Sequence, residues 1–93
     1  MPTILHILKE PHSPVALEMI NEEARNPDLK ILILLIQEAV TKPIPSNRLV
    51  KIYILKEDLA ERGSTIPSHS NYTSINYQGM LDLIYQADKI VTW

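Results

Sequence analysis

The sequence predicts an α/β fold, in which helices cover the faces of a parallel or mostly parallel sheet. From Ile31 to Ile36 the chain is unbroken Ile and Leu. A strand with one wet face would alternate apolar and polar residues, so this run predicts a strand that is covered on both faces. A buried helix segment could look the same, but the short length and β-branched content favour a strand. Strands and helices then alternate along the chain, which indicates right-handed crossovers.

The first half of the chain predicts a strand, a helix and the central strand. Thr3 to Leu8 is mostly apolar and is interrupted by His6. Ser13 followed by Pro14 is a helix start, because the hydroxyl can cap a backbone N–H and proline tolerates the first helical position. The expected helix runs to about Arg25. Its apolar stripe consists of Leu17, Ile20 and Ala24, flanked by Ala16 and Met19. After the central strand, Pro43 and Pro45 argue against a long helix over residues 41–48.

The second half predicts a strand, a helix, a loop, a short strand, a helix and a closing strand. Their expected bounds are Leu49 to Leu55, Lys56 to Gly63, Ser64 to Ser74, Thr73 to Asn76, Tyr77 to Ala87 and Lys89 to Trp93. Gly63 supplies a left-handed helix stop, and Gly79 weakens the last helix by roughly 1 kcal/mol relative to alanine. The apolar residues at helical spacing in that helix are Tyr77, Met80, Leu81, Ile84 and Ala87.

Length and composition narrow the class of protein. The 93 residues form a single domain, residues 1–93, with too little chain for two cores. A net charge of −2 with scattered Lys and Arg gives no case for nucleic acid as a direct partner. No secretory signal is visible, and the longest apolar run is too short to cross a bilayer. We therefore expect a cytoplasmic protein without a membrane partner.

The chain contains no cysteine. This excludes disulfides, thiolate metal sites, a cysteine nucleophile and a persulfide carrier within these residues. The three histidines, His6, His12 and His69, show no metal-ligand spacing, and two glycines cannot form a glycine-rich phosphate loop. No metal, no cofactor and no catalytic residue is therefore predicted.

Five segments of the chain match, in the same order, the sequence pattern of one protein family. They are ILH from Ile4, LIQEAV from Leu35, IYILKEDLAERG from Ile52, INYQG from Ile75 and KIVTW from Lys89. This set resembles the DsrH/TusB family of sulfur relay proteins. The family pattern has an ILH-type first strand, LLIQ-[DE]-[GA]-V, VYALKEDLxARG, I-x-Y-x-G/D-F and a terminal aromatic residue. The VYALKEDLxARG-like segment is the most specific part, and the match extends over nearly the whole chain.

The resemblance implies a DsrEFH-like, three-layer α/β/α sandwich around a mostly parallel five-stranded sheet. It also implies a small subunit of a hetero-oligomer with DsrE/TusD-like and DsrF/TusC-like partners, in which sulfur travels as a persulfide on the partners' cysteines. Some family members carry a cysteine in the first helix, where this chain has Leu17, Glu18, Met19 and Ile20. A methionine thioether cannot form a persulfide, so that role is absent here. The segment 41–48 also departs from relatives that have a longer, helical segment there.

The candidate contact residues are polar groups on or after the predicted strands. His6 could contact a ligand at the edge of the sheet or could be a hydrogen-bonded structural histidine. Gln37 and Glu38 follow the central strand at its carboxyl end, where open α/β sheets place their ligands, although they could also cap the following turn. Lys56, Glu57 and Asp58 could form a second half of the same carboxyl-end site or could be a solvated helix start. Trp93 could fill the core or anchor a neighbouring subunit.

These observations lead to one principal hypothesis and one alternative. The first is a non-catalytic subunit of a cytosolic sulfur relay complex that supports persulfide transfer by cysteine-bearing partners, for 2-thiolation of tRNA wobble uridine or for sulfur oxidation. The alternative is a small-molecule-binding module or homo-oligomer without relay activity, with His6, Gln37 and Glu38 lining its pocket. An enzyme that works without cysteine is a weaker third possibility.

Overall fold

A computed structural model of the chain describes residues 2–10, 14–41, 50–63 and 72–93. Its elements are, in order, β1 (Thr3–Leu8), α1 (Pro14–Ala24), β2 (Lys30–Leu35), a 3₁₀ helix η1 (Gln37–Thr41), β3 (Val50–Leu55), α2 (Lys56–Glu61), β4 (Tyr72–Ile75), α3 (Tyr77–Gln86) and β5 (Lys89–Thr92). The five strands form one sheet in the order β4-β3-β2-β1-β5, and every pair is parallel. The predicted element order and the five-stranded α/β architecture are therefore confirmed, and the sheet is wholly parallel.

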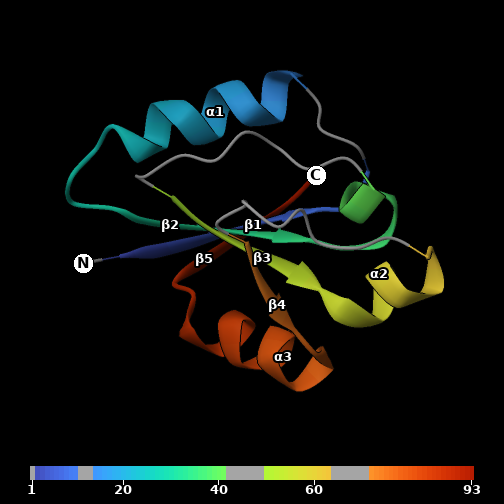
Figure 1. Ribbon diagram of the computed structural model, residues 1–93. Helices are drawn as coiled ribbons and strands as arrows, with labels where there is room; N and C mark the ends of the chain where they lie inside the picture. The colour runs from blue at the N-terminus through green and yellow to red at the C-terminus, as the bar shows by residue number, and fades with distance from the viewer. Residues whose placement is uncertain (1, 11–13, 42–49, 64–71) are drawn as a thin grey trace.

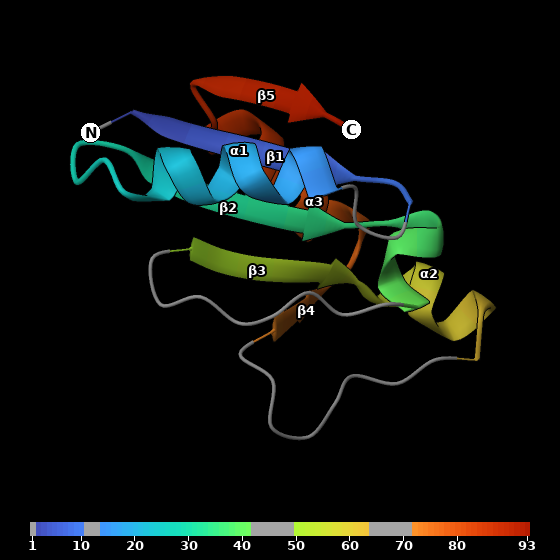
Figure 2. The same ribbon diagram turned by 90° about the horizontal axis from the view of Figure 1, so that it is seen from above.

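The sheet lies between helices on its two faces. Figure 1 shows α1 above the sheet and α3 below it, which makes the three layers of the predicted sandwich. Figure 2, seen from above, shows η1 and α2 together beyond the carboxyl ends of β2 and β3. No helix in the described part of the chain is long and apolar enough to span a membrane.

The central strand β2 is the structural core, as its composition predicts. Residues Ile31 to Leu35 are all buried. Their side chains alternate between the faces of the sheet, so Ile31, Ile33 and Leu35 join the cluster under α1, whereas Leu32 and Leu34 join the cluster over α3. Each fully buried side chain contributes roughly 1.5–3 kcal/mol. An all-apolar strand is thus required because both faces of the sheet are covered.

Helix α1 packs on the sheet through one narrow stripe. Its buried residues are Ala16, Ile20 and Ala24, while Leu17 is partly buried. Met19, which the sequence placed beside the apolar stripe, is largely exposed. The proposed cap Ser13, the proline-containing segment 42–49 and the loop 64–71 lie outside the described residues.

Helix α3 is rotated relative to the face that its sequence suggests. Tyr77 and Leu81 belong to the predicted stripe but are exposed, and the fully buried residue is Leu83. Met80, Ile84 and Ala87 pack beside Leu83 on the sheet. The spacing therefore predicted the helix correctly, but two of its five apolar residues do not meet the sheet, because two overlapping rows at helical spacing run along this helix.

Gly63 and Gly79 are each favoured by the local structure, for different reasons. Gly63, after α2, has φ +63°, so it provides the predicted left-handed stop. Gly79 lies in the first turn of α3, where a Cβ would come within 3.0 Å of the Ile75 Cβ. Because α3 approaches the end of β4 so closely, a residue with a Cβ would fit at position 79 only if Ile75 moved. This explains why a glycine stands there although glycine lowers helix stability. The Asn76 side chain accepts the Gly79 N–H at 2.9 Å and caps this helix.

Candidate functional site

The carboxyl ends of β2 and β3 are joined by side chains from η1 and α2. Directly after β2, Gln37 adopts φ 51°, an uncommon left-handed conformation for a residue other than glycine. Its backbone N–H donates to Oδ2 of Asp58 at 2.6 Å. Asp58 is buried, so this charge-assisted bond satisfies a carboxylate that would otherwise be costly to bury. The sharp turn after β2 is thus held by the third residue of α2.

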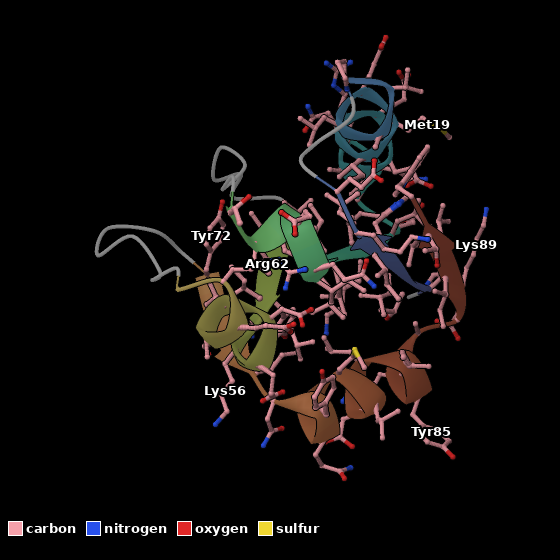
Figure 3. All side chains as sticks on the ribbon, turned by 90° about the vertical axis from the view of Figure 1, so that its right-hand side faces the viewer. Met19, Lys56, Arg62, Tyr72, Tyr85 and Lys89 are labelled. Carbon is pink, nitrogen blue, oxygen red and sulfur yellow. The ribbon has the colours of Figure 1, made fainter. Side chains whose placement is uncertain are left out.

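Arg62 provides the second link between the same two segments. Its Nε donates to Oε1 of Glu38 at 3.0 Å, and its Nη1 lies 3.9 Å from Oδ1 of Asp58 and 3.8 Å from Oε2 of Glu61. Figure 3 shows Arg62 beside η1. One guanidinium thus faces three carboxylates. Because Glu38 is well exposed, its own pair contributes less than about 1 kcal/mol, and the arrangement mainly fixes the geometry of the edge.

Lys56 does not take part in this cluster. It is the first residue of α2 and is exposed, and in Figure 3 its side chain extends away from the protein. The next residue, Glu57, has a buried Oε2 atom without a hydrogen-bond partner. Of the residues predicted to share the carboxyl-end site, the structure joins Gln37 and Glu38 to Asp58, with Arg62 as a further partner, and leaves Lys56 outside.

His6 forms a separate cluster on the α1 face of the sheet. The imidazole is 1 % exposed. Its Nε2 lies 2.5 Å from Oε1 of Glu23, from the last turn of α1, and its Nδ1 accepts the Trp93 indole N–H at 3.1 Å. The centroids of the two rings lie 6.2 Å apart, and the ring planes are inclined by 20°. His6 is thus bonded through both ring nitrogens, inside the fold rather than at the edge of the sheet.

The partners of His6 determine which ring nitrogen carries the proton. An indole N–H can only donate, so Nδ1 of His6 must present its lone pair to Trp93. The proton then lies on Nε2, where it donates to the carboxylate of Glu23. Glu23 stands in the last turn of α1, where the helix dipole disfavours a negative charge. Its bond to His6 explains why a carboxylate is nevertheless found there.

Trp93 lies at the topological switch point of the sheet. Strands β1 to β4 are added in one direction, whereas β5 returns to the other side of β1. Ligands of open α/β sheets bind at the carboxyl ends of the strands flanking such a point. Here the Trp93 backbone N–H donates to the Ile7 carbonyl at 2.9 Å, and its side chain packs on the core cluster under α1. Trp93 therefore occupies the position where related architectures hold ligands.

The candidate residues therefore form two groups rather than one pocket. His6 pairs in register with Ile33 of β2, four residues before Gln37, a separation of roughly 13 Å along a strand. Of the residues that complete the two groups, Asp58 was a sequence candidate for the carboxyl-end site, whereas sequence reasoning missed Glu23 and Arg62. The acidic residue in the last turn of α1 was the available signal for Glu23. Among the described residues, no three His, Asp or Glu side chains lie together as a metal site would need.

Comparisons with known proteins identify a family and solved structures of similar fold. A family model described as "DsrH like protein" matches residues 12–90. The crystal structure of the YchN protein from E. coli superposes with a TM-score of 0.70 over 100 % of both chains, at 19 % sequence identity. This likeness establishes the fold alone. No curated protein matches the sequence.

Proposed function

Because the chain belongs to the DsrH-like family, which implies a sulfur relay subunit, we propose that it is a non-catalytic subunit of such a complex. The observation that carries the proposal is the absence of cysteine from its 93 residues. In persulfide relay, a thiolate attacks the outer sulfur of a donor persulfide, takes over that sulfur and releases the donor thiolate. This chain has no thiol to do so. The sulfur must therefore travel on companion chains.

The geometry of both candidate groups supports a structural role. Gln37 and Glu38 are engaged by Asp58 and Arg62, and His6 is engaged by Glu23 and Trp93. The Gln37 backbone N–H, one carboxylate oxygen of Glu38 and both ring nitrogens of His6 are thus bonded within the chain, and Trp93 lies at the switch point. These contacts make a rigid edge suited to positioning a neighbouring subunit rather than an open cavity for a small molecule.

The companion chains that fit this role are cysteine-bearing DsrE/TusD-like and DsrF/TusC-like subunits. In this proposal the chain holds them in the arrangement that receives and passes on the persulfide, in the cytoplasm. The sulfur would serve 2-thiolation of tRNA wobble uridine or sulfur oxidation. Glu38 and Lys56, both exposed at the carboxyl edge, are the first contact residues that we would assign to a partner.

Affinity purification of the tagged chain from its native cells tests this function. The expected result is a stable hetero-oligomer with small cysteine-containing α/β chains, measured by light scattering and identified by mass spectrometry. The charge-reversal variant Lys56→Glu should weaken recovery of those chains, and Lys30→Glu, exposed at the opposite end of the sheet, is the matched control. Recovery of this chain alone at every salt concentration would contradict the proposal.

A further inference from the structure

Helix α3 exposes a row of large apolar side chains that the sheet does not cover. Tyr77, Leu81 and Tyr85 are 53 %, 47 % and 89 % exposed. They are spaced at i, i+4 and i+8, so they form one continuous ridge, which we call the α3 row. In Figure 3 the Tyr85 side chain points away from the protein. Three of the six large hydrophobic residues found exposed in the described chain therefore lie on this ridge.

The apolar surface of α3 is wider than its packing against the sheet requires. The residues that contact the sheet are Met80, Leu83, Ile84 and Ala87. At about 100° per residue they occupy roughly 100° of the helix, whereas the apolar arc from Leu83 round to Tyr85 occupies roughly 200°. The opposite flank is polar and carries Asp82 and Gln86. About half of the apolar arc is thus left without a function in folding.

We propose that the α3 row is the interface between two copies of this chain, which pack their α3 helices antiparallel about a two-fold axis near Leu81. The sequence of the row is symmetric about its centre, Tyr–Leu–Tyr. A two-fold axis at Leu81 therefore places Tyr77 of one copy on Tyr85 of the other, twice over, as an isologous interface requires. Ridges formed by i, i+4 rows pack at about −50° with the helix axes 8–10 Å apart.

Charge and area fit this occupant. The α3 row carries no charge, so two copies meet without the like-charge repulsion that would oppose self-association. At about 200 Å² per aromatic side chain, the two tyrosines expose roughly 280 Å² per copy. Leu81 adds to this, and so does Ile90, which is 42 % exposed and aligned with the α3-facing Leu5 of β1. A stable interface buries about 800 Å² per partner, so this smaller apolar centre gives a weak dimer that forms only at high chain concentration.

Cysteine cross-linking tests the arrangement, because the natural chain has no cysteine to interfere. Leu81→Cys lies on the predicted axis, where two Cα atoms come within the 4.4–6.8 Å or so that a disulfide needs. We expect disulfide-linked dimers from Leu81→Cys under mild oxidation. Gln86→Cys, on the polar flank of the same helix, is the matched control and should remain monomeric. A mixture of Tyr77→Cys and Tyr85→Cys chains should cross-link more than either chain alone.

A second measurement separates this interface from random collision and from other occupants. By sedimentation velocity, the natural chain should shift from monomer to dimer with rising concentration, whereas Leu81→Arg should stay monomeric and Gln86→Arg should behave like the natural chain. Equal cross-linking of Leu81→Cys and Gln86→Cys, or a natural chain that stays monomeric up to about 500 µM, would overturn the proposal. Protection of Leu81→Cys from thiol reagents only when a companion chain is added would also overturn it. The inference goes beyond the relay role, and since these tests use the chain alone, either proposal can fail without the other.

Discussion

Replacing Trp93 by phenylalanine should destabilise the fold by about 1–3 kcal/mol through a single lost hydrogen bond. Phenylalanine keeps an aromatic ring to stack on His6 but has no N–H. The Nδ1 lone pair of His6, which now accepts the indole N–H at 3.1 Å, would then have no partner. The His6 proton cannot move there to compensate, because Nε2 needs it for the bond to Glu23.

The size of the effect follows from burial. His6 is 1 % exposed, so water cannot easily replace the indole N–H and the full desolvation penalty of the acceptor applies. Every kcal/mol lowers the melting temperature of a domain of this size by about 4–8 °C, so the melting temperature should fall by roughly 4–24 °C. A surface residue that only covered the sheet would change the free energy of unfolding by less than about 0.5 kcal/mol.

Urea unfolding followed by circular dichroism measures this free energy without depending on the single tryptophan. The variants Trp93→Phe, His6→Leu and the double variant complete a thermodynamic cycle. We expect a coupling of about 0.5–3 kcal/mol with an unchanged m-value, since the double variant removes donor and acceptor together. Additive effects, or a Trp93→Phe variant as stable as the natural chain, would refute the hydrogen-bond network.

Substitutions at three further positions test the fold and the carboxyl edge. Leu34→Asp should fail to fold, since it buries an unpaired charge at a wholly buried position, whereas Leu34→Ala should fold with a loss of about 2–5 kcal/mol; a cooperatively melting Leu34→Asp would show that β2 is not central. Asp58→Ala should cost about 1–3 kcal/mol in urea unfolding by orphaning the Gln37 N–H, and Asp58→Asn, which keeps an acceptor, should cost less; equal losses would contradict this bond. Gly63→Ala should lower stability by about 1–2 kcal/mol in thermal melts, although nothing lies within 4 Å of the added Cβ, because φ +63° is strained for alanine; an unchanged melting temperature would refute this reasoning.

The fold was predictable because its strongest signals are local. The run from Ile31 to Ile36 can be satisfied only where both faces are covered, and the structure places it in the centre of the sheet. The end of a helix was predicted accurately where a residue with a specific backbone role marks it, as Gly63 does after α2. The 3₁₀ helix η1 was not predicted, since its start depends on a left-handed Gln37 that is held by a carboxylate 21 residues away.

The face of α3 could not be predicted for a different reason. Both Leu81 and Leu83 lie on apolar rows at helical spacing, and the choice between the rows depends on how the crossover from β4 to β5 sets the rotation of the helix. A Cβ at position 79 would lie 3.0 Å from the Ile75 Cβ, which shows how closely the first turn of α3 approaches Ile75. Such a constraint arises only in the assembled fold.

The candidate contacts depended on pairings that sequence spacing does not encode. His6 and Trp93 are 87 residues apart, and Glu23 reaches His6 from another layer. The sequence left His6 open between ligand contact and structural histidine. Its two bonds explain how a polar ring is tolerated inside an apolar strand. Gln37 and Glu38 follow the carboxyl end of β2, and Asp58 was a candidate for the same site, but the bond between Asp58 and the Gln37 N–H and the participation of Arg62 required the tertiary structure.

The location of the label after persulfide loading tests the central claim most directly. The complex isolated through the tagged chain would be incubated with a donor that carries radiolabelled sulfane sulfur, and its chains would be separated without reductant. We expect reductant-releasable label on the cysteine-bearing companion chains and none on this chain, which has no thiol. Covalent label on this chain that a reductant releases would contradict its role as a non-catalytic subunit.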